Sequence, residues 1–530
     1  MNKFRLFSIS ICLLIFIIFS VNAASQTESS KTGQVTEGAL NDSVAVDSDQ
    51  IKENRALDFV RSFNSGNADD YEQYMQLNRA RAVLESASPD QRKGGFQQLS
   101  AMFGQFKVNA VSLDESGELR LRVESSTAKE HLDIVFTYLS DEEFRVQGIN
   151  FEPAGLEVSI DPGWQNLQGL LDEYVVTTGV PAWAVAIIKD GEITEQAAGG
   201  HRSMRANEAI SAEESKFHWG SVSKSMTATL IAALVEAEKL RLDTTIGEVF
   251  TDLPMIDAYR DVTIEQLLAH RSGLPPFENF TAEFVQGILD GAESPVAGRS
   301  NWVDQLLTEA LPIYPPGTGH RYSNAGFTVA GVMAERVTGK TWEQLLEEYV
   351  WQPLGMKQTG AGWPATSEDS EQTRGHFGND SQDIQLAPTD ALASLLVITA
   401  PAGNVHSTVG DLAKYAQAHL NSLTGRTIDR QKLKSASLRR LHQPLAEERK
   451  RPEPYSGGWG QVKLPNGQTM HWHNGGAGSF YAEVRLIPEE DLAVVIMANA
   501  GFAERAIGPL WEALYQRYGE CCVEPMTEAG

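Results

Sequence analysis

The chain has 530 residues, of which 42% are hydrophobic, 22% charged and 8% aromatic. These proportions are typical of a globular protein with two or three domains, and they exclude a fibrous or intrinsically disordered chain. The 70 acidic and 44 basic residues give a formal net charge of −26 at pH 7. A chain this acidic is repelled by nucleic acid and by anionic lipid, so we expect neither as a partner.

The first 23 residues have the pattern of a secretion signal. Lys3 and Arg5 supply a basic start, residues 6–21 are apolar apart from three serines, and Val21–Ala23 ends in the small residue that a signal peptidase reads. The apolar run is short for a membrane span, which needs roughly 20 residues. We predict a cleaved signal at 1–23 and a periplasmic or extracellular protein with no membrane segment after cleavage. An uncleaved N-terminal anchor is the alternative.

The three cysteines predict neither a disulfide framework nor a metal site. Cys12 lies in the signal, and Cys521 and Cys522 are neighbours in a tail at 520–530. Frameworks and metal sites use separated cysteines. A strained bridge between the neighbours and pairing with another chain are alternatives, but we favour two inert tail residues.

A small α+β domain is predicted at residues 55–155. Residues 24–54 begin with a polar stretch that has no apolar period, and we expect a flexible leader there. A helix is expected from Arg55. Alternating apolar and polar residues indicate half-buried strands at 119–123, 132–138 and 144–146. Helices followed by antiparallel strands are typical of an α+β domain.

The turn Phe63-Asn64-Ser65-Gly66 resembles that of nuclear-transport-factor-two-like (SnoaL-like) cone domains. The resemblance implies a pocket, a dimer surface or a structural appendage. We see no catalytic set within 55–155, so we expect a structural role for this domain.

A second domain is predicted at residues 163–519. Asp190-Gly191 separates two strand-like runs and is a strong hairpin signal, because both turn positions favour positive φ. A largely apolar helix is expected from Ser221 to Leu240. Further strands are expected late in the domain, at 461–464, 469–472, 480–486 and 493–497. Strands at both ends with helices between them imply one antiparallel sheet with a helical insert.

The first candidate for chemistry is Ser221-Val222-Ser223-Lys224. A serine hydroxyl becomes a good nucleophile only when a base removes its proton. At a helix start, Ser221 and Lys224 lie one turn apart on the same face. The positive helix end favours the basic form of the lysine, and its N–H groups can bind a developing oxyanion. Ser126-Thr127-Ala128-Lys129 matches the same pattern, but it lies among predicted strands and we interpret it as a surface turn.

The second candidate, Tyr322-Ser323-Asn324, is the only Tyr-x-Asn sequence in the chain. It follows a loop rich in proline and glycine and precedes an apolar helix. A tyrosine hydroxyl beside a lysine can act as a general acid or base. The alternative is that Ser323 or Asn324 only caps the helix.

The third candidate is His473-Asn474-Gly475-Gly476, at the end of a predicted strand. The two glycines would let a substrate lie against the strand edge, and the N–H of Gly476 could be a second oxyanion donor. An ordinary loop between strands is the alternative. His471 and His473 share a strand face and could hold zinc, but no third ligand is evident, so we expect no metal.

Taken in order across 163–519, Ser-x-x-Lys, Tyr-x-Asn and His-x-Gly resemble the serine β-lactamase and penicillin-binding-protein family. The likeness is closest to class C enzymes and to the esterases and D-amino-acid-specific peptidases of that fold. Further stretches that fit the family are 267–275, 353–356 and 402–408. The resemblance implies an α/β (α+β) β-lactamase/transpeptidase-like fold, with an antiparallel sheet flanked by a helical subdomain. It also implies an acyl-enzyme route that uses no metal or cofactor.

The resemblance also implies roles for single residues. Ser221 would attack a carbonyl with help from Lys224 and Tyr322. The N–H groups of Ser221 and Gly476 would hold the oxyanion. Tyr322 would protonate the leaving group and later help to activate water, and Asn324 would orient the substrate.

One position departs from the β-lactamase pattern, because those enzymes carry lysine where this chain has His473. An unperturbed histidine has a pKa near ~6.5 and is mostly neutral at pH 7. The departure favours an esterase or peptidase over a dedicated β-lactamase. We therefore predict a secreted serine hydrolase acting on a small-molecule or peptide substrate through an ester, an amide or D-amino-acid peptide, or a lactam. A catalytically weak module that binds peptide or cell-wall fragments is the runner-up, and a structural role led by the N-terminal domain is a third reading.

Overall fold

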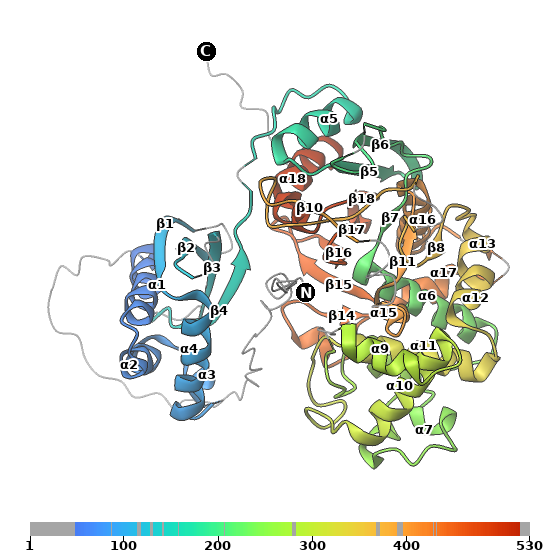
Figure 1. The fold of residues 1–530 in the computed structure, drawn as a ribbon, viewed down its shortest axis with the longest axis horizontal. Coiled ribbons are helices and arrows are strands. Elements are labelled where there is room, and N and C mark those ends of the chain that lie inside the picture. Colours follow the sequence, from blue (N-terminus) through green and yellow to red (C-terminus); the bar gives the residue numbers. More distant parts are fainter. Residues whose placement is uncertain are drawn as a thin grey trace, which may run out of the picture. The chain divides into compact units, whose positions relative to one another are not determined.

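The computed structural model describes residues 48–519 except 86, 114–117, 128–130, 140–142, 157, 206, 278–281, 367–370, 389–395, 428 and 431. The predicted signal at 1–23 and the tail at 520–530, with the three cysteines, lie outside the described residues. The chain divides into an N-terminal unit, Met1–Gly155, and a C-terminal unit, Leu156–Gly530 (Figure 1). Within the described part, no helix is long and apolar enough to cross a membrane.

The N-terminal unit combines helices with one four-stranded antiparallel sheet. Its helices are α1 (Ser48–Asn64), α2 (Ala68–Asn78), α3 (Arg81–Glu85) and α4 (Pro89–Phe103). The strands pair in the order β1-β2-β3-β4, with β1 (Phe106–Leu113), β2 (Leu119–Ser125), β3 (His131–Tyr138) and β4 (Val146–Pro153). Helix α1 begins at Ser48, inside the expected leader of 24–54. Asp49 lies in its first turn, where the positive end of the helix favours an acidic side chain.

The core of the N-terminal unit is largely aromatic. Phe59 of α1 packs edge-on against Phe136 of β3, with ring centroids 5.6 Å apart. Phe63, one helical turn further along α1, stacks on Phe106 of β1 at 4.8 Å. The aromatic spacing of α1 therefore gives that helix one face for the sheet. Strand β1 was not predicted from the sequence, because most of its residues are exposed and its alternation of apolar and polar residues is weak.

The C-terminal unit is built on a seven-stranded antiparallel sheet in the order β14-β15-β16-β17-β18-β5-β6. Its strands are β5 (Ala182–Lys189), β6 (Glu192–Gly200), β14 (Tyr455–Ser456), β15 (Trp459–Lys463), β16 (Thr469–Gly476), β17 (Tyr481–Ile487) and β18 (Leu492–Ala498). The last long strand, β18, pairs with β5 from the start of the unit. The prediction of one antiparallel sheet drawn from both ends of the domain is confirmed.

Two helices from the ends of the unit cover one face of this sheet. They are α5 (Leu167–Thr178) and α18 (Ile507–Tyr518), which share a buried cluster with Trp183, Val185 and Ile187 of β5 (Figure 1). The alternate residues Ala184, Ala186 and Ile188 belong to a second cluster with the helical insert. Strand β5 is therefore buried on both faces, which explains its continuous apolar sequence.

The helical insert lies between β6 and β14 in the chain. Its helices are α6 (Ser223–Glu236), α7 (Ile246–Val249), α8 (Ile264–Leu268), α9 (Ala282–Asp290), α10 (Pro295–Glu309), α11 (Asn324–Thr338), α12 (Trp342–Leu346), α13 (Gln352–Leu354), α15 (Ala400–Gly403), α16 (Val409–Leu423) and α17 (Ser435–Leu441). Its short strands are β7 (Phe217–His218), β8 (Gly360–Ala361), β9 (His376–Phe377), β10 (Gln385–Leu386), β11 (Val405–Ser407), β12 (Asp429–Arg430) and β13 (Leu433–Lys434). Helix α16 packs on β18 and β5, which joins the insert to the centre of the sheet.

Local sequence signals account for several junctions in this unit. Asp190 and Gly191 form the turn between β5 and β6 with φ values of 54° and 81°, as their hairpin signal predicts. Thr263 caps α8, and its side chain and that of Gln266 form a capping box.

Candidate active site

Ser221 lies in a 3₁₀ turn, Gly220–Val222, that leads directly into α6. Every residue of α6 from Ser223 to Leu234 is buried, so the helix is fixed on all sides. Lys224 Nζ donates a hydrogen bond to Ser221 Oγ at 3.0 Å. The expected helix was 221–240, but α6 ends at Glu236, and Glu238 follows with a φ of 56° that a helix does not contain.

The side chain of Lys224 is completely buried, and its Nζ donates hydrogen bonds to oxygen atoms of Ser221, Asn324 and Ala402. Besides Ser221 Oγ, it donates to Asn324 Oδ1 at 2.7 Å and to the carbonyl oxygen of Ala402 in α15 at 2.8 Å. A neutral amine has two N–H donors and one lone pair. When the Asn324 and Ala402 oxygens take the two N–H groups, the lone pair faces Ser221 Oγ, which is the arrangement that a base for this hydroxyl needs.

The Tyr322-Ser323-Asn324 sequence lies at the start of α11. Ser323 is the N-cap, and its hydroxyl accepts a hydrogen bond from Gly326 N–H. The capping interpretation is therefore right for Ser323. Tyr322 and Asn324, however, both face Lys224, whose Nζ lies 4.6 Å from the centroid of the Tyr322 ring. The loop brings two of the predicted residues to the nucleophile.

The end of β16 approaches the Ser221 turn so closely that only glycine fits. A Cβ on Gly475 would lie 2.0 Å from Trp219 O and 2.5 Å from Ser221 N. Gly476 differs, because a Cβ there would meet nothing within 4 Å, and this residue is exposed. The backbone of β16 thus lies beside the backbone of the nucleophile turn, and Gly476 borders open space.

His473 is buried on β16 and has a defined tautomer. Its Nδ1 lies 2.6 Å from the carbonyl oxygen of Asn474, which can only accept, so Nδ1 carries the proton. Its Nε2 then accepts from the hydroxyl of Tyr455, 2.9 Å away. Burial, aided by the nearby positive charge of Lys224, lowers the pKa of His473 to about 3. The ring is therefore neutral at pH 7 and is not a substitute for a lysine cation.

Sequence reasoning missed two aromatic residues that complete this site. The His270 ring lies between those of Tyr322 and Tyr455, with centroid distances of 4.4 and 4.5 Å. His270 lies in the stretch 267–275 that fits the family pattern, but nothing in that stretch gave it a role. Tyr455 carried no sequence signal, because only the pairing of β14, β15 and β16 brings it beside His473.

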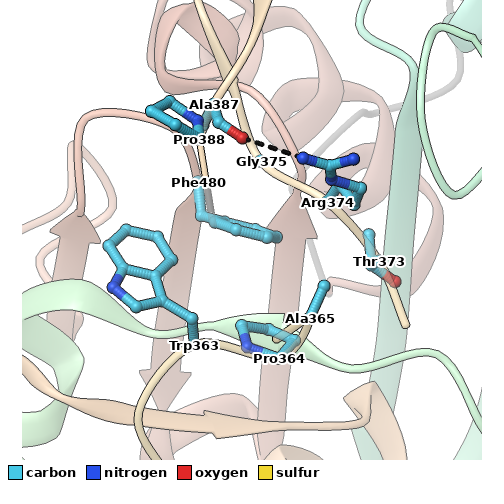
Figure 2. Close-up of a pocket in the computed structure, with 9 residues that line it drawn as sticks. All are labelled: Trp363, Pro364, Ala365, Thr373, Arg374, Gly375, Ala387, Pro388 and Phe480. Carbon is cyan, nitrogen blue, oxygen red and sulfur yellow. Dashed lines mark hydrogen bonds between the residues drawn. The ribbon is translucent and has the colours of Figure 1, made fainter. Parts of the chain in front are cut away.

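An aromatic wall supports the Ser221 turn from the side of β7. His218 accepts a hydrogen bond from Gly220 N–H at 3.1 Å, and its ring stacks on Trp363 at 4.6 Å. Figure 2 shows Trp363 and Phe480, which both line a small pocket. The pocket lining includes none of the predicted site residues, so we assign it a supporting role.

The two competing sequence patterns lie elsewhere. His471 is not paired with His473 but contacts His442, with 3.3 Å between their Nδ1 atoms. Among the described residues, no group of three His, Cys, Asp or Glu side chains could hold a metal ion. Ser126 belongs to the N-terminal unit, where its hydroxyl accepts from Gln105 N–H, and Lys129 lies outside the described residues.

Comparison with known proteins identifies the C-terminal unit. A family model described as Beta-lactamase matches residues 167–516. Penicillin-binding protein 4 of Amycolatopsis lactamdurans is 29% identical over 341 residues, which is 63% of this chain and 85% of that protein. An unguisins hydrolase of Aspergillus campestris (strain IBT 28561) is 26% identical over 364 residues, 66% of this chain. That match spans 64% of the fungal protein, less than two thirds of its length.

The solved structures agree with the sequence relatives. The octameric penicillin-binding protein homologue from Pyrococcus abyssi is 26% identical, with a TM-score of 0.52 over 65% of this chain and 74% of that chain. The Beta-lactamase model covers well over half of the 530 residues. This chain therefore belongs to the beta-lactamase family of serine hydrolases.

Proposed function

We propose that the C-terminal unit is a hydrolase that acts through an acyl-enzyme on Ser221. The observation that carries the proposal is the hydrogen-bonded set of Ser221, Lys224 and Asn324, with Tyr322 packed against the lysine. A nucleophile in contact with a buried amine, next to exposed backbone at Gly476, has the parts that acyl transfer requires.

In the first step, Ser221 Oγ forms a bond to the substrate carbonyl carbon. The hydroxyl proton passes to the amine of Lys224, and the carbonyl electron pair moves to oxygen. The N–H groups of Ser221 and Gly476 are the proposed donors to that oxyanion, because the two backbone segments lie side by side. The Asn324 and Ala402 oxygens stabilise the lysine once it is charged.

In the second step, the bond to the leaving group breaks and an ester remains on Ser221. Tyr322 is the proposed donor of the proton to the leaving group. Lys224, whose Nζ lies over the Tyr322 ring, then returns a proton to the tyrosine oxygen. Water then forms a bond to the ester carbon and gives its proton, through Tyr322, to Lys224. The bond from that carbon to Ser221 Oγ breaks, Oγ takes a proton back from Lys224, and the acid product leaves. Asn324, which is held by Lys224 and by the carbonyl of Phe277 at 2.8 Å, is the proposed contact for the substrate.

The proposed substrate is a neutral ester, amide or D-amino-acid peptide in preference to a β-lactam antibiotic. His473 occupies the position of the lysine that helps β-lactamases to bind a substrate carboxylate. Both of its ring nitrogens are already hydrogen-bonded, and its pKa is lowered to about 3. A neutral ring provides hydrogen bonding and shape but no charge for an anionic group.

The runner-up is a module that captures a peptide or a wall fragment without turnover. A missing nucleophile, base or tyrosine would favour it, and Ser221, Lys224 and Tyr322 are all present and in contact range.

For the N-terminal unit we propose a structural appendage of the SnoaL-like type. From the signal-like sequence at 1–23 we propose secretion to the periplasm or the exterior.

The test is activity profiling of the purified protein with a fluorophosphonate probe, p-nitrophenyl esters, D-Ala peptides and a cephalosporin. We expect covalent labelling of wild type, none of Ser221→Ala, and faster turnover of esters or peptides than of the cephalosporin. Equal labelling of both proteins would refute the nucleophile. Stable binding with no turnover across the panel would favour the capture module.

A further inference from the structure

The loop that carries Tyr322 rests on a second loop, residues 270–276. Hydrogen bonds join the two loops at several points, among them Ile313 N–H to Gly273 O at 2.9 Å, Gly317 N–H to Arg271 O at 2.8 Å, Ser323 Oγ–H to Pro275 O at 2.8 Å, and Asn324 N–H to Pro276 O at 2.8 Å. The path of the Tyr322 loop is therefore set by the loop beneath it.

His270 holds Tyr322 from both sides. Its carbonyl oxygen accepts from Arg321 N–H at 2.9 Å, and its Nδ1 accepts from Ser323 N–H at 3.1 Å. Its ring packs against the Tyr322 ring with 4.4 Å between centroids. Both chain neighbours of Tyr322 and the tyrosine ring itself are thus fixed by one residue.

The chemistry of the His270 ring suits a fixed support and not a proton carrier. Because Nδ1 accepts from a backbone N–H, the proton is on Nε2. The side chain is 1% exposed, and burial lowers its pKa well below 6.5, so the ring is neutral at working pH. Among the described residues Nε2 has no hydrogen-bond partner, so no donor or acceptor relays a proton through it.

The backbone of His270 points to the same role. Its φ is 57°, in the left-handed region that is unfavourable for a residue other than glycine. Such a conformation persists only when the surroundings fix it, and here the bonds to the Tyr322 loop do so. The ring also packs against Tyr455, which holds His473, so one imidazole contacts both Tyr322 and the residue that fixes His473.

We propose that His270 is a positioning residue of the hydrolytic reaction, which holds the Tyr322 side chain at the distance from Ser221 and Lys224 that proton transfer needs. The proposal rests on the proposed function. Misplacing a catalytic group by about 1 Å costs on the order of 100-fold in rate.

Two substitutions separate the contributions of His270. His270→Phe keeps an aromatic ring but removes the acceptor for Ser323 N–H. His270→Asn loses the ring, yet it tolerates positive φ and places an oxygen where Nδ1 was. With a p-nitrophenyl ester, we expect His270→Phe to lower kcat by roughly 10- to 100-fold with KM within about 3-fold. We expect His270→Asn to recover part of this loss, and the pH profile of both variants to keep its shape.

His419→Phe is the matched control, because His419 is also fully buried in the C-terminal unit and its ring hydrogen-bonds to Thr229 and His442. Rates are compared at equal folded fraction, measured by tryptophan fluorescence. The proposal is overturned if His270→Phe keeps at least half of the wild-type kcat, if it loses no more than His419→Phe, or if it removes a limb of the pH profile. If His270→Phe does not fold, a His270→Asn variant with wild-type kcat at every pH contradicts the ring contribution, and one with lowered kcat supports it.

Ser221→Ala in the same assay separates the two proposals. Wild-type turnover by Ser221→Ala would overturn the proposed function, and with it this inference. Loss of turnover by Ser221→Ala, together with an unaffected His270→Phe, would overturn the positioning role alone.

Discussion

The hydroxyl of Tyr455 lies 2.9 Å from Nε2 of His473 and donates to it, because the other ring nitrogen already donates to Asn474. This donor stabilises the neutral ring. Tyr455→Phe removes it, so we expect the pKa of His473 to rise from about 3 while staying below 6.5, since burial is the larger cause. NMR titration of the histidine ring nitrogens measures the shift. Tyr349→Phe, at another buried tyrosine, is the control, and an unchanged or lower pKa would contradict the assignment.

Replacing His473 by lysine changes the charge of the site and hence its substrate preference. A cation at this position attracts a substrate carboxylate, most strongly where water is excluded. For His473→Lys we expect the ratio of kcat/KM for a D-Ala peptide with a free carboxylate over its amidated form to rise by about 10-fold, which corresponds to about 1.4 kcal/mol. His473→Gln, which adds no charge, is the comparison. If the ratio of kcat/KM values rises equally in both variants, the added charge is not the cause of the change in substrate preference.

Removing the Lys224 amine tests its role as base. Lys224→Met should lower the rate of acylation by about 10²- to 10⁴-fold, the usual contribution of a general base. Lys224→Arg should be no better, because a guanidinium is not deprotonated in proteins. Burst kinetics with a p-nitrophenyl ester gives the acylation rate. Lys414→Met, a partly exposed lysine, serves as control, and wild-type bursts from Lys224→Arg would refute the base assignment.

The two glycines at the end of β16 predict different effects on stability when each is replaced by alanine. A Cβ on Gly475 would overlap Trp219 O at 2.0 Å, so Gly475→Ala must push the strand away from the nucleophile turn. We expect a loss of about 2 kcal/mol or more in the free energy of unfolding. Gly476→Ala meets nothing within 4 Å and should leave Tm unchanged. Calorimetry of the two variants measures their Tm values. Equal Tm values would show that β16 does not approach the Ser221 turn this closely.

Buried histidines predict that the protein loses stability in mild acid. Burial lowers the pKa of eight of them: His218, His270, His320, His376, His419, His442, His471 and His473. In the unfolded chain these histidines bind protons with a pKa near ~6.5. In the folded chain, where their pKa values are lower, they stay neutral at the same pH. Their contribution is therefore present above pH ~6.5 and is lost as the pH falls toward about 4, the value for His471.

Each proton taken up on unfolding changes stability by about 1.4 kcal/mol per pH unit. We expect the midpoint of urea unfolding to fall steeply between pH 6.5 and 4, and to fall less in His419→Gln, whose pKa is lowered to about 3 in the wild type. A flat profile over this range would contradict the proton linkage.

The sequence predicted the parts of the fold that short-range patterns control. The Asp190-Gly191 turn and the apolar run of α6 are each decided by neighbouring residues. Strand β1 was missed because its exposed residues leave little alternation to detect. The early start of α1 at Ser48 was missed because it follows a polar stretch that resembles a leader.

The candidate site likewise contains contacts that the sequence could predict and contacts that it could not. Ser221 and Lys224 are one helical turn apart, so their contact could be predicted from spacing. The third acceptor of Lys224 is a carbonyl oxygen at Ala402, which any residue type could supply, 178 positions away in the chain. Likewise, only the fold brings His270 beside Tyr322. Contacts through backbone atoms or through distant loops leave no residue-type signal in one sequence.

The pairing of β18 with β5 has a consequence for how the chain acquires its structure. Ala498 opposes Trp183 and Leu492 opposes Lys189, so the centre of the sheet joins segments separated by about three hundred residues. Long-range strand pairs of this kind form slowly, because a large loop must close before any contact compensates for the lost entropy. During synthesis, the apolar faces of α6 and α11 must therefore remain uncovered until the last strands emerge. An emerging chain in this state is a natural client for chaperones, and variants truncated before β18 should aggregate instead of yielding a smaller folded unit.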